Sequence, residues 1–137
     1  MFLLDTNVIS ELRNGKPQQS VAVRAWAENL PANQLYLSVV TVLELEIGVL
    51  RMERKDALQG KILRTWVETV LQQFDSQVLP FTGETALLCA GMHVPDPRSF
   101  RDSMIAATAQ QHSLTLVTRN VADFEGLSIK MLNPWEH

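Results

Sequence analysis

Short apolar segments alternate along this chain with longer stretches that show helical periodicity. Five segments read as strands, at residues 2–4, 35–40, 77–81, 114–118 and 128–132. Helices are predicted between them, at residues 7–13, 21–30, 41–53, 57–74, 83–93 and 101–112. This alternation is typical of an α/β fold, with a largely parallel central sheet and helices on both of its faces.

Size and composition favour one soluble domain spanning residues 1–137. Apolar residues make up 46% of the chain, which is enough to build a core. The single cysteine, Cys89, has no intrachain disulfide partner, and it lies in an apolar stretch where a buried thiol is expected. Asp5 interrupts the first apolar run, and the longest apolar stretch, at residues 35–50, carries Glu44 and Glu46 and is too broken to cross a membrane. We therefore expect a cytoplasmic protein.

Two polar clusters follow predicted strands. Asp5 comes directly after the strand at residues 2–4, and Thr118 to Asn120 come at the end of the strand at residues 114–118. In open α/β sheets, ligands bind beyond the carboxyl ends of the strands. The predicted topology therefore directs both clusters toward the same edge of the sheet.

Four acidic residues are candidates for a site, and each also has an ordinary structural explanation. Asp5 could cap the helix that follows it. Glu44 lies three residues after Thr41, which is the spacing of a capping box. Asp102 opens a helix, where a negative charge meets the positive end of the helix dipole. Asp123 could be a turn residue.

The structural explanations account for each acid singly but not for the four together. In a doubly wound fold their positions converge, and carboxylates brought close together repel one another unless a cation lies between them. Mg²⁺ and Mn²⁺ prefer oxygen ligands of this kind. The three histidines, at positions 93, 112 and 137, lack the spacing of a zinc site. A cluster of this kind suits phosphate-ester hydrolysis by metal-activated water.

The overall charge of the chain is −3, which is not the basic balance usual for a nucleic-acid binder. Without the four candidate acids, however, 12 basic residues face 11 acidic ones. Arg98, Arg101 and Arg119 flank the candidate site in the sequence, where they could contact an anionic substrate. The alternative for each is an ordinary solvated arginine.

Three segments of the sequence resemble the PIN-domain ribonucleases of the VapC/FitB type, the toxins of type II toxin–antitoxin pairs. These segments are LLDTNVIS, VTVLELEIGV and FRDSMIAATAQQHSLTLVTRNVADFEGL. The resemblance implies an acidic quartet at Asp5, Glu44, Asp102 and Asp123. It also implies polar companions that hold the carboxylates or a bound water, at Thr6, Asn7, Thr118 and Asn120. Glu46 is a possible alternative to Glu44, but the two point about 200° apart on a helix.

The same resemblance implies Mg²⁺- or Mn²⁺-dependent cleavage of RNA, usually tRNA or another structured RNA cut in a loop. Asp5 and Asp102 would be the principal metal ligands, and Glu44 and Asp123 would complete the pocket and position the attacking water. The implied partners are a second copy of the chain and an antitoxin, which itself binds promoter DNA. An arginine of the antitoxin would then meet the acidic site.

Alternatives remain open at this stage. The domain could be a catalytically silent binding module that acts only through antitoxin or dimer contacts. A phosphatase of the haloacid-dehalogenase type also begins with an aspartate at a strand end, but its D-x-D motif is broken here by Asn7. The helix at residues 57–74, with Trp66, could be a partner surface or simply part of the core.

Overall fold

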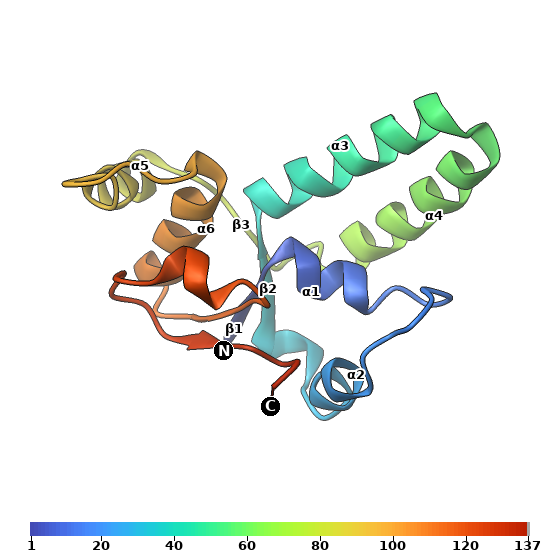
Figure 1. The fold of residues 1–137 in the computed structure, drawn as a ribbon, viewed down its shortest axis with the longest axis horizontal. Helices are drawn as coiled ribbons and strands as arrows, with labels where there is room; N and C mark the ends of the chain where they lie inside the picture. The colour runs from blue at the N-terminus through green and yellow to red at the C-terminus, as the bar shows by residue number, and fades with distance from the viewer. Residues whose placement is uncertain (137) are drawn as a thin grey trace.

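A computed structural model describes residues 1–136, and its centre is a parallel sheet of five strands (Figure 1). The strands lie in the order β3-β2-β1-β4-β5, so the first strand of the chain is at the middle of the sheet. Every neighbouring pair is parallel. The strands are β1 (Phe2–Leu4), β2 (Leu35–Ser38), β3 (Val78–Leu79), β4 (Thr115–Val117) and β5 (Met131–Leu132).

Helical segments connect the strands, as the alternating pattern predicted. Six α-helices and two 3₁₀ turns lie within residues 1–136. The helices are α1 (Thr6–Glu11), α2 (Val21–Glu28), α3 (Val39–Lys55), α4 (Ala57–Gln73), α5 (Gly83–Gly91) and α6 (Phe100–Gln111). The 3₁₀ turns are η1 (Ala32–Gln34) and η2 (Val121–Phe124). The predicted α/β class is confirmed.

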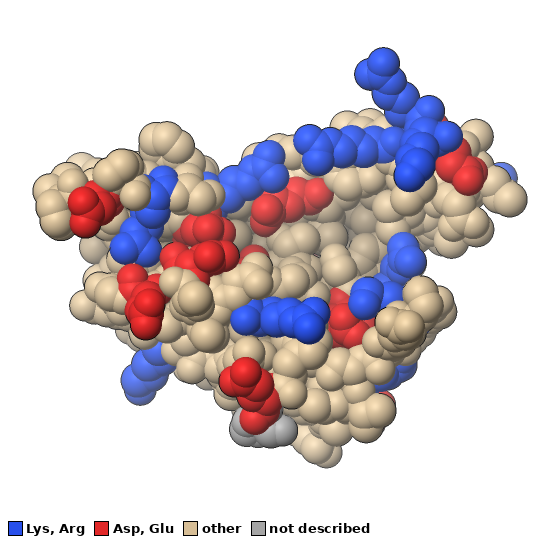
Figure 2. Space-filling view, in the orientation of Figure 1, with Lys and Arg blue, Asp and Glu red and all other residues tan. Residues whose placement is uncertain are grey.

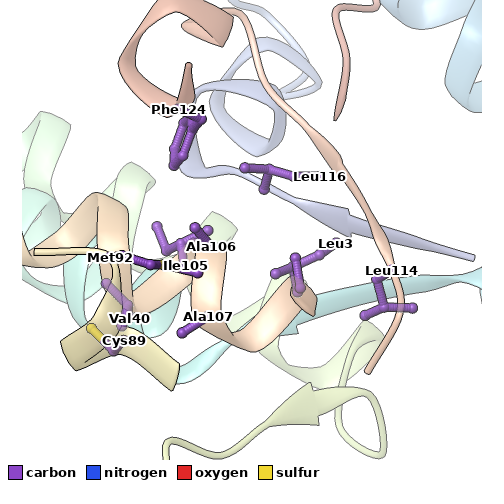
Figure 3. Close-up of a cluster of buried hydrophobic side chains, with 11 residues drawn as sticks. Leu3, Val40, Cys89, Met92, Ile105, Ala106, Ala107, Leu114, Leu116 and Phe124 are labelled. Carbon is purple, nitrogen blue, oxygen red and sulfur yellow. The ribbon is translucent and has the colours of Figure 1, made fainter. Parts of the chain in front are cut away.

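Alternating side chains of the central strands divide the core into two clusters. Leu3 and Leu116 point to the face covered by α5 and α6, where they pack with Ile105 (Figure 3). Leu4 and Val117, the next residues along the same strands, point to the other face and join the cluster of α1 to α4. Successive side chains of a strand point to opposite faces, so helices on both sides are needed to bury β1 and β4. Cys89 is buried in the first cluster, as predicted.

The second strand is shorter than predicted. We expected it to extend to Val40, because Val39 and Val40 continue its β-branched run. Instead β2 ends at Ser38, whose Oγ accepts hydrogen bonds from the backbone N–H groups of Val40 (2.9 Å) and Thr41 (3.4 Å). This N-cap starts α3 two residues earlier than the sequence suggested.

Helices α3 and α4 form a hairpin that projects from the body as an arm (Figure 1). Arg64 of α4 joins the two helices, with ion pairs to Glu46 (2.6 Å) and Glu53 (2.9 Å) of α3. Helix α4 contributes to the core on one side only, because Val67 and Val70 are buried, whereas Leu58 and Ile62 are exposed.

No helix within residues 1–136 is long and apolar enough to cross a membrane.

Candidate active site

Asp5 is the most firmly held of the four candidate acids. It follows β1 directly and is also the N-cap of α1, so its Oδ1 accepts a 2.8 Å hydrogen bond from the backbone N–H of Thr6. Its Oδ2 accepts from Thr118 Oγ1 (2.8 Å) and Asn7 Nδ2 (3.3 Å). Its exposed fraction is only 7%. The capping role predicted for Asp5 is therefore confirmed, and it leaves the proposed role of Asp5 in a site possible.

The polar residues that follow β4 are tied to the residues around Asp5. Thr118 Oγ1 accepts from Asn7 Nδ2 (3.3 Å) and from the backbone N–H of Asn120 (3.1 Å). The backbone N–H of Arg119 donates to Asn7 Oδ1 (3.2 Å). Thr118 and Asn7 thus contact Asp5 with their side chains, whereas Arg119 and Asn120 support this arrangement with their backbone. These bonds join the ends of β1 and β4 at the predicted edge.

Glu44 reaches the site from α3, but not in the way the sequence suggested. We expected it in the first turn, in a capping box with Thr41; because α3 begins at Val39, Glu44 lies in the second turn and that capping box does not form. Its Oε1 accepts a 2.7 Å hydrogen bond from Thr6 Oγ1, and Arg101 lies 3.6 Å from its Oε2. Glu46 faces away, in its ion pair with Arg64.

Asp102 and Asp123 differ from the other two acids in having free oxygens. Asp102 lies in the first turn of α6 and is partly buried, and Asp123 lies on η2 and is exposed. Across residues 1–136, neither carboxylate accepts a hydrogen bond that would use up its lone pairs. Asp5 and Glu44 are held by the protein, while Asp102 and Asp123 keep their oxygens available to a ligand.

Neighbouring acidic charges affect the ionisation of Asp5 and Asp102. Burial raises the pKa of Asp5, against the lowering effect of its bonds from Thr118 and Thr6, and the charges of Glu44 and Asp123 raise it further. The pKa of Asp102 is also raised, by burial first and then by the charges of Asp123, Asp5 and Glu44. Carboxylates from four separate segments therefore converge, which individual capping roles do not explain. Figure 2 shows acidic side chains gathered where α3, α6 and η2 meet.

The three flanking arginines occupy different environments, and Arg101 is the one that lies beside Glu44. Arg98 bonds to the backbone oxygens of Met92 (3.1 Å), Asp123 (3.3 Å) and Glu125 (3.5 Å), and its charge opposes the raised pKa of Asp102. Arg119 is exposed and lies over the ring of Trp135, 5.0 Å from its centroid. Sequence reasoning missed the role of Arg98 in fixing η2, because contacts to backbone oxygens leave no pattern in a sequence.

The donor set fits a hard divalent cation. All four side chains offer carboxylate oxygens, and no histidine or thiol lies among them, which is the chemistry preferred by Mg²⁺ and Mn²⁺. In the described part of the chain, no group of three or more His, Cys, Asp and Glu side chains is arranged so that it could hold a metal ion. The carboxylates thus converge without completing a ligand cage.

Comparison with protein families agrees with this arrangement. The model of the PIN domain matches residues 2–127, which include all four acids. The toxin FitB of Neisseria gonorrhoeae is 36% identical, over 98% of this chain and 99% of that protein. This chain belongs to the PIN-domain family, among the VapC/FitB toxins. The VapC ribonuclease Y4jK of Sinorhizobium fredii is 35% identical to this PIN domain, over 99% of each protein.

Solved structures extend the comparison to the fold. The crystal structure of FitAcB from Neisseria gonorrhoeae contains a chain that matches this PIN domain with a TM-score of 0.91 and 36% identity, over 100% of both chains. A toxin–antitoxin complex from Klebsiella pneumoniae matches with a TM-score of 0.71 and 26% identity, over 98% of both chains. The PIN fold proposed from the three sequence segments is thus confirmed.

Proposed function

We propose that this PIN domain is the ribonuclease toxin of a toxin–antitoxin pair and that it hydrolyses RNA with the help of Mg²⁺ or Mn²⁺. The observation that carries the proposal is the convergence of Asp5, Glu44, Asp102 and Asp123, whose charges raise the pKa of Asp5 and Asp102. Such repulsion is costly for a purely structural cluster, and a divalent cation relieves it. The ribonuclease name of the relative from Sinorhizobium fredii supports the same chemistry.

Each acid has a role that follows from its surroundings. Asp102 would hold the ion with its free oxygens, and Asp5 would share that role while its hydrogen bonds fix its orientation. When bound, the ion supplies a Lewis acid that lowers the pKa of a coordinated water and offsets charge on the leaving oxygen. Glu44, oriented by Thr6, and the exposed Asp123 would position the attacking water and accept its proton.

The substrate we propose is a single-stranded region of a structured RNA, such as a tRNA loop. Unstacked nucleotides expose their phosphodiesters and their base edges, whereas an A-form helix hides its bases in a deep groove. Arg119 is exposed next to the site and joined to Asn7 through its backbone, so its side chain can contact the substrate.

The proposed protein partners are a cognate antitoxin and a second copy of the chain. The complex from Klebsiella pneumoniae shows that a similar fold can carry an antitoxin. An apolar cavity of about 410 Å³ between α1 and α4 is a candidate contact, lined in part by Leu12, Trp66 and Phe74. Promoter DNA would be contacted only through the antitoxin. An arginine of the antitoxin would pair with the free carboxylates of the site and compete with the cation. We place the protein in the cytoplasm.

The decisive experiment uses purified, antitoxin-free protein and a labelled tRNA, with EDTA, Mg²⁺ or Mn²⁺. We expect cleavage only with the metals, and we expect Asp102→Asn to lose it. Asp75→Asn is the matched control, because Asp75 is an exposed acid outside the site. If folded wild-type protein binds antitoxin but cleaves no RNA under any metal condition, the protein is a silent binding module. If the purified protein does cleave RNA, mapping RNA ends after brief induction in cells identifies its natural target.

A further inference from the structure

One face of α3 leads from the acidic site to the end of the arm. Glu44, Gly48, Arg51 and Lys55 recur at spacings of four, three and four residues, so they form a single stripe along the helix. Glu44 is at the end of the stripe next to Thr6 of the site. At 1.5 Å per residue, the stripe is about 16 Å long. It therefore runs outward from the place where the chemistry would occur.

The middle of the stripe is empty of side chains. Gly48 is exposed, and a Cβ added at this position would meet no atom within 4 Å. The packing of α3 therefore does not require a glycine here, even though glycine is unfavourable inside a helix. A residue without a side chain leaves room for a ligand to approach the helix backbone between Glu44 and the two cations.

The distal end of the stripe carries unpaired positive charge. Arg51 and Lys55 are exposed, and neither forms an ion pair within residues 1–136. The nearby acids are already engaged: Glu53 pairs with Arg64, and Asp56 caps α4 by accepting from the backbone N–H of Gln59. Figure 2 shows basic side chains along the arm, although the whole chain has a net charge of −3.

We propose that this stripe is a track for the RNA strand on one side of the scissile phosphate, with Arg51 and Lys55 binding its phosphates and Gly48 leaving room for it. The proposal rests on the proposed ribonuclease function. A phosphate backbone is bound by cations that lack competing carboxylates, and each phosphate contact releases counterions. The spacing of about 3.4 Å per nucleotide in a helical strand sets an upper limit, so a track of about 16 Å accommodates at most four or five nucleotides of a more extended single strand.

The test compares two RNAs and two pairs of charge reversals. A labelled dinucleotide occupies only the acidic site, whereas a 15-nucleotide single strand also reaches the track. The track variant is Arg51→Glu with Lys55→Glu. The control is Arg54→Glu with Lys61→Glu, because Arg54 and Lys61 are exposed cations of the same arm, outside the stripe, and the change in net charge is identical.

For the track variant we expect KM for the long RNA to rise at least tenfold, with kcat/KM for the dinucleotide unchanged within about twofold. The plot of log affinity against log salt concentration should become less steep, its negative slope shrinking in magnitude by about 1.4, as expected for the loss of two phosphate contacts to a single strand. The control should change each quantity by less than threefold. Equal losses of long-RNA binding in both variants would overturn the proposal, because the effect would then come from net charge. No loss in either variant would also overturn it, because the two cations would then not contact the RNA.

A steric variant tests the track without changing charge. Gly48→Leu should weaken binding of the long RNA, and Gly48→Ala should not. Binding is measured by fluorescence anisotropy in an Asp5→Asn background, so it does not depend on catalysis. If wild-type protein cleaves neither RNA, the proposed function fails, while anisotropy still reports on the track. If the track variant loses antitoxin binding and keeps RNA binding, the surface belongs to the antitoxin and the proposal is wrong.

Discussion

Thr118 Oγ1 donates a 2.8 Å hydrogen bond to Asp5 Oδ2, joining residues that are 113 positions apart in the sequence. The bond stabilises the ionised carboxylate and so opposes the effect of burial, which raises the pKa of Asp5. The contact is possible because β1 and β4 are adjacent parallel strands whose carboxyl ends lie side by side. One hydroxyl thus helps to set the charge of the most buried acid in the site.

The first prediction concerns the pH dependence of cleavage. Thr118→Val removes the hydrogen bond that lowers the pKa of Asp5, so this pKa should rise further. The acid limb of a plot of kcat/KM against pH should therefore move to higher pH, while Thr118→Ser should restore the wild-type profile. A profile of Thr118→Val that is lower at every pH but unshifted would show that Thr118 acts only on structure.

The second prediction concerns the stability of the folded protein in the absence of metal. The pKa of Asp102 is raised in the folded state, so folding favours its protonated form, and its charge opposes folding once the pH is above the folded pKa. Asp102→Asn should therefore raise Tm at pH 8, by an amount that solvent screening of this partly exposed group keeps small. The gain should shrink as the pH falls toward the ordinary pKa of an aspartate. A Tm gain that does not depend on pH would contradict this account.

The third prediction concerns metal binding itself. A ligand that binds only the folded state raises Tm as its concentration increases. Millimolar Mg²⁺ or Mn²⁺ should therefore stabilise the wild-type protein, and removal of the metal with EDTA should reverse the gain. In Asp102→Asn the gain should be much smaller, because a ligand with free oxygens is lost. Equal stabilisation of both proteins, measured by thermal unfolding, would place the metal elsewhere.

The sequence predicts the sheet and the convergence of the acids because both follow from local patterns. The run ending at Asp5 and the strand before Thr118 are strongly apolar, and the carboxyl ends of parallel strands meet at one edge. The prediction fails in one local and one tertiary case. Locally, Ser38 caps a helix where the β-branched Val39 and Val40 favour a strand, which moves the start of α3 and places Glu44 in the second turn. In the tertiary case, Arg98 bonds to the backbone oxygens of Asp123 and Glu125, which are 25 and 27 residues away in the sequence.

The fourth prediction concerns a buried acid outside the site. Glu11 is 5% exposed, and its two oxygens accept from Lys16 Nζ (2.8 Å) and the backbone N–H of Ser20 (2.7 Å). These bonds fix the loop between α1 and α2 and lower the pKa of Glu11. Glu11→Ala should cost about 1–3 kcal/mol, because it leaves a backbone N–H without its partner. Urea unfolding at pH 7 measures the loss, and Glu28→Ala, at an exposed position, is the control.

The fifth prediction compares one substitution at two glycines of the arm. Gly60 lies where α4 crosses α3, and a Cβ there would come within 2.5 Å of the Cα of Glu53, a backbone atom that cannot move without shifting the helix. Gly60→Ala should therefore destabilise the protein by about 1–3 kcal/mol, the usual range for overpacking. Gly48→Ala should do the opposite and stabilise it by about 0.5–1 kcal/mol, because Gly48 faces open space inside a helix. Urea unfolding of both variants measures the two effects. If both substitutions were stabilising, helix propensity alone would decide the effect of alanine in the arm. The close contact between α3 and α4 at Gly60 would then not be the constraint that places Arg64 beside Glu46 and Glu53.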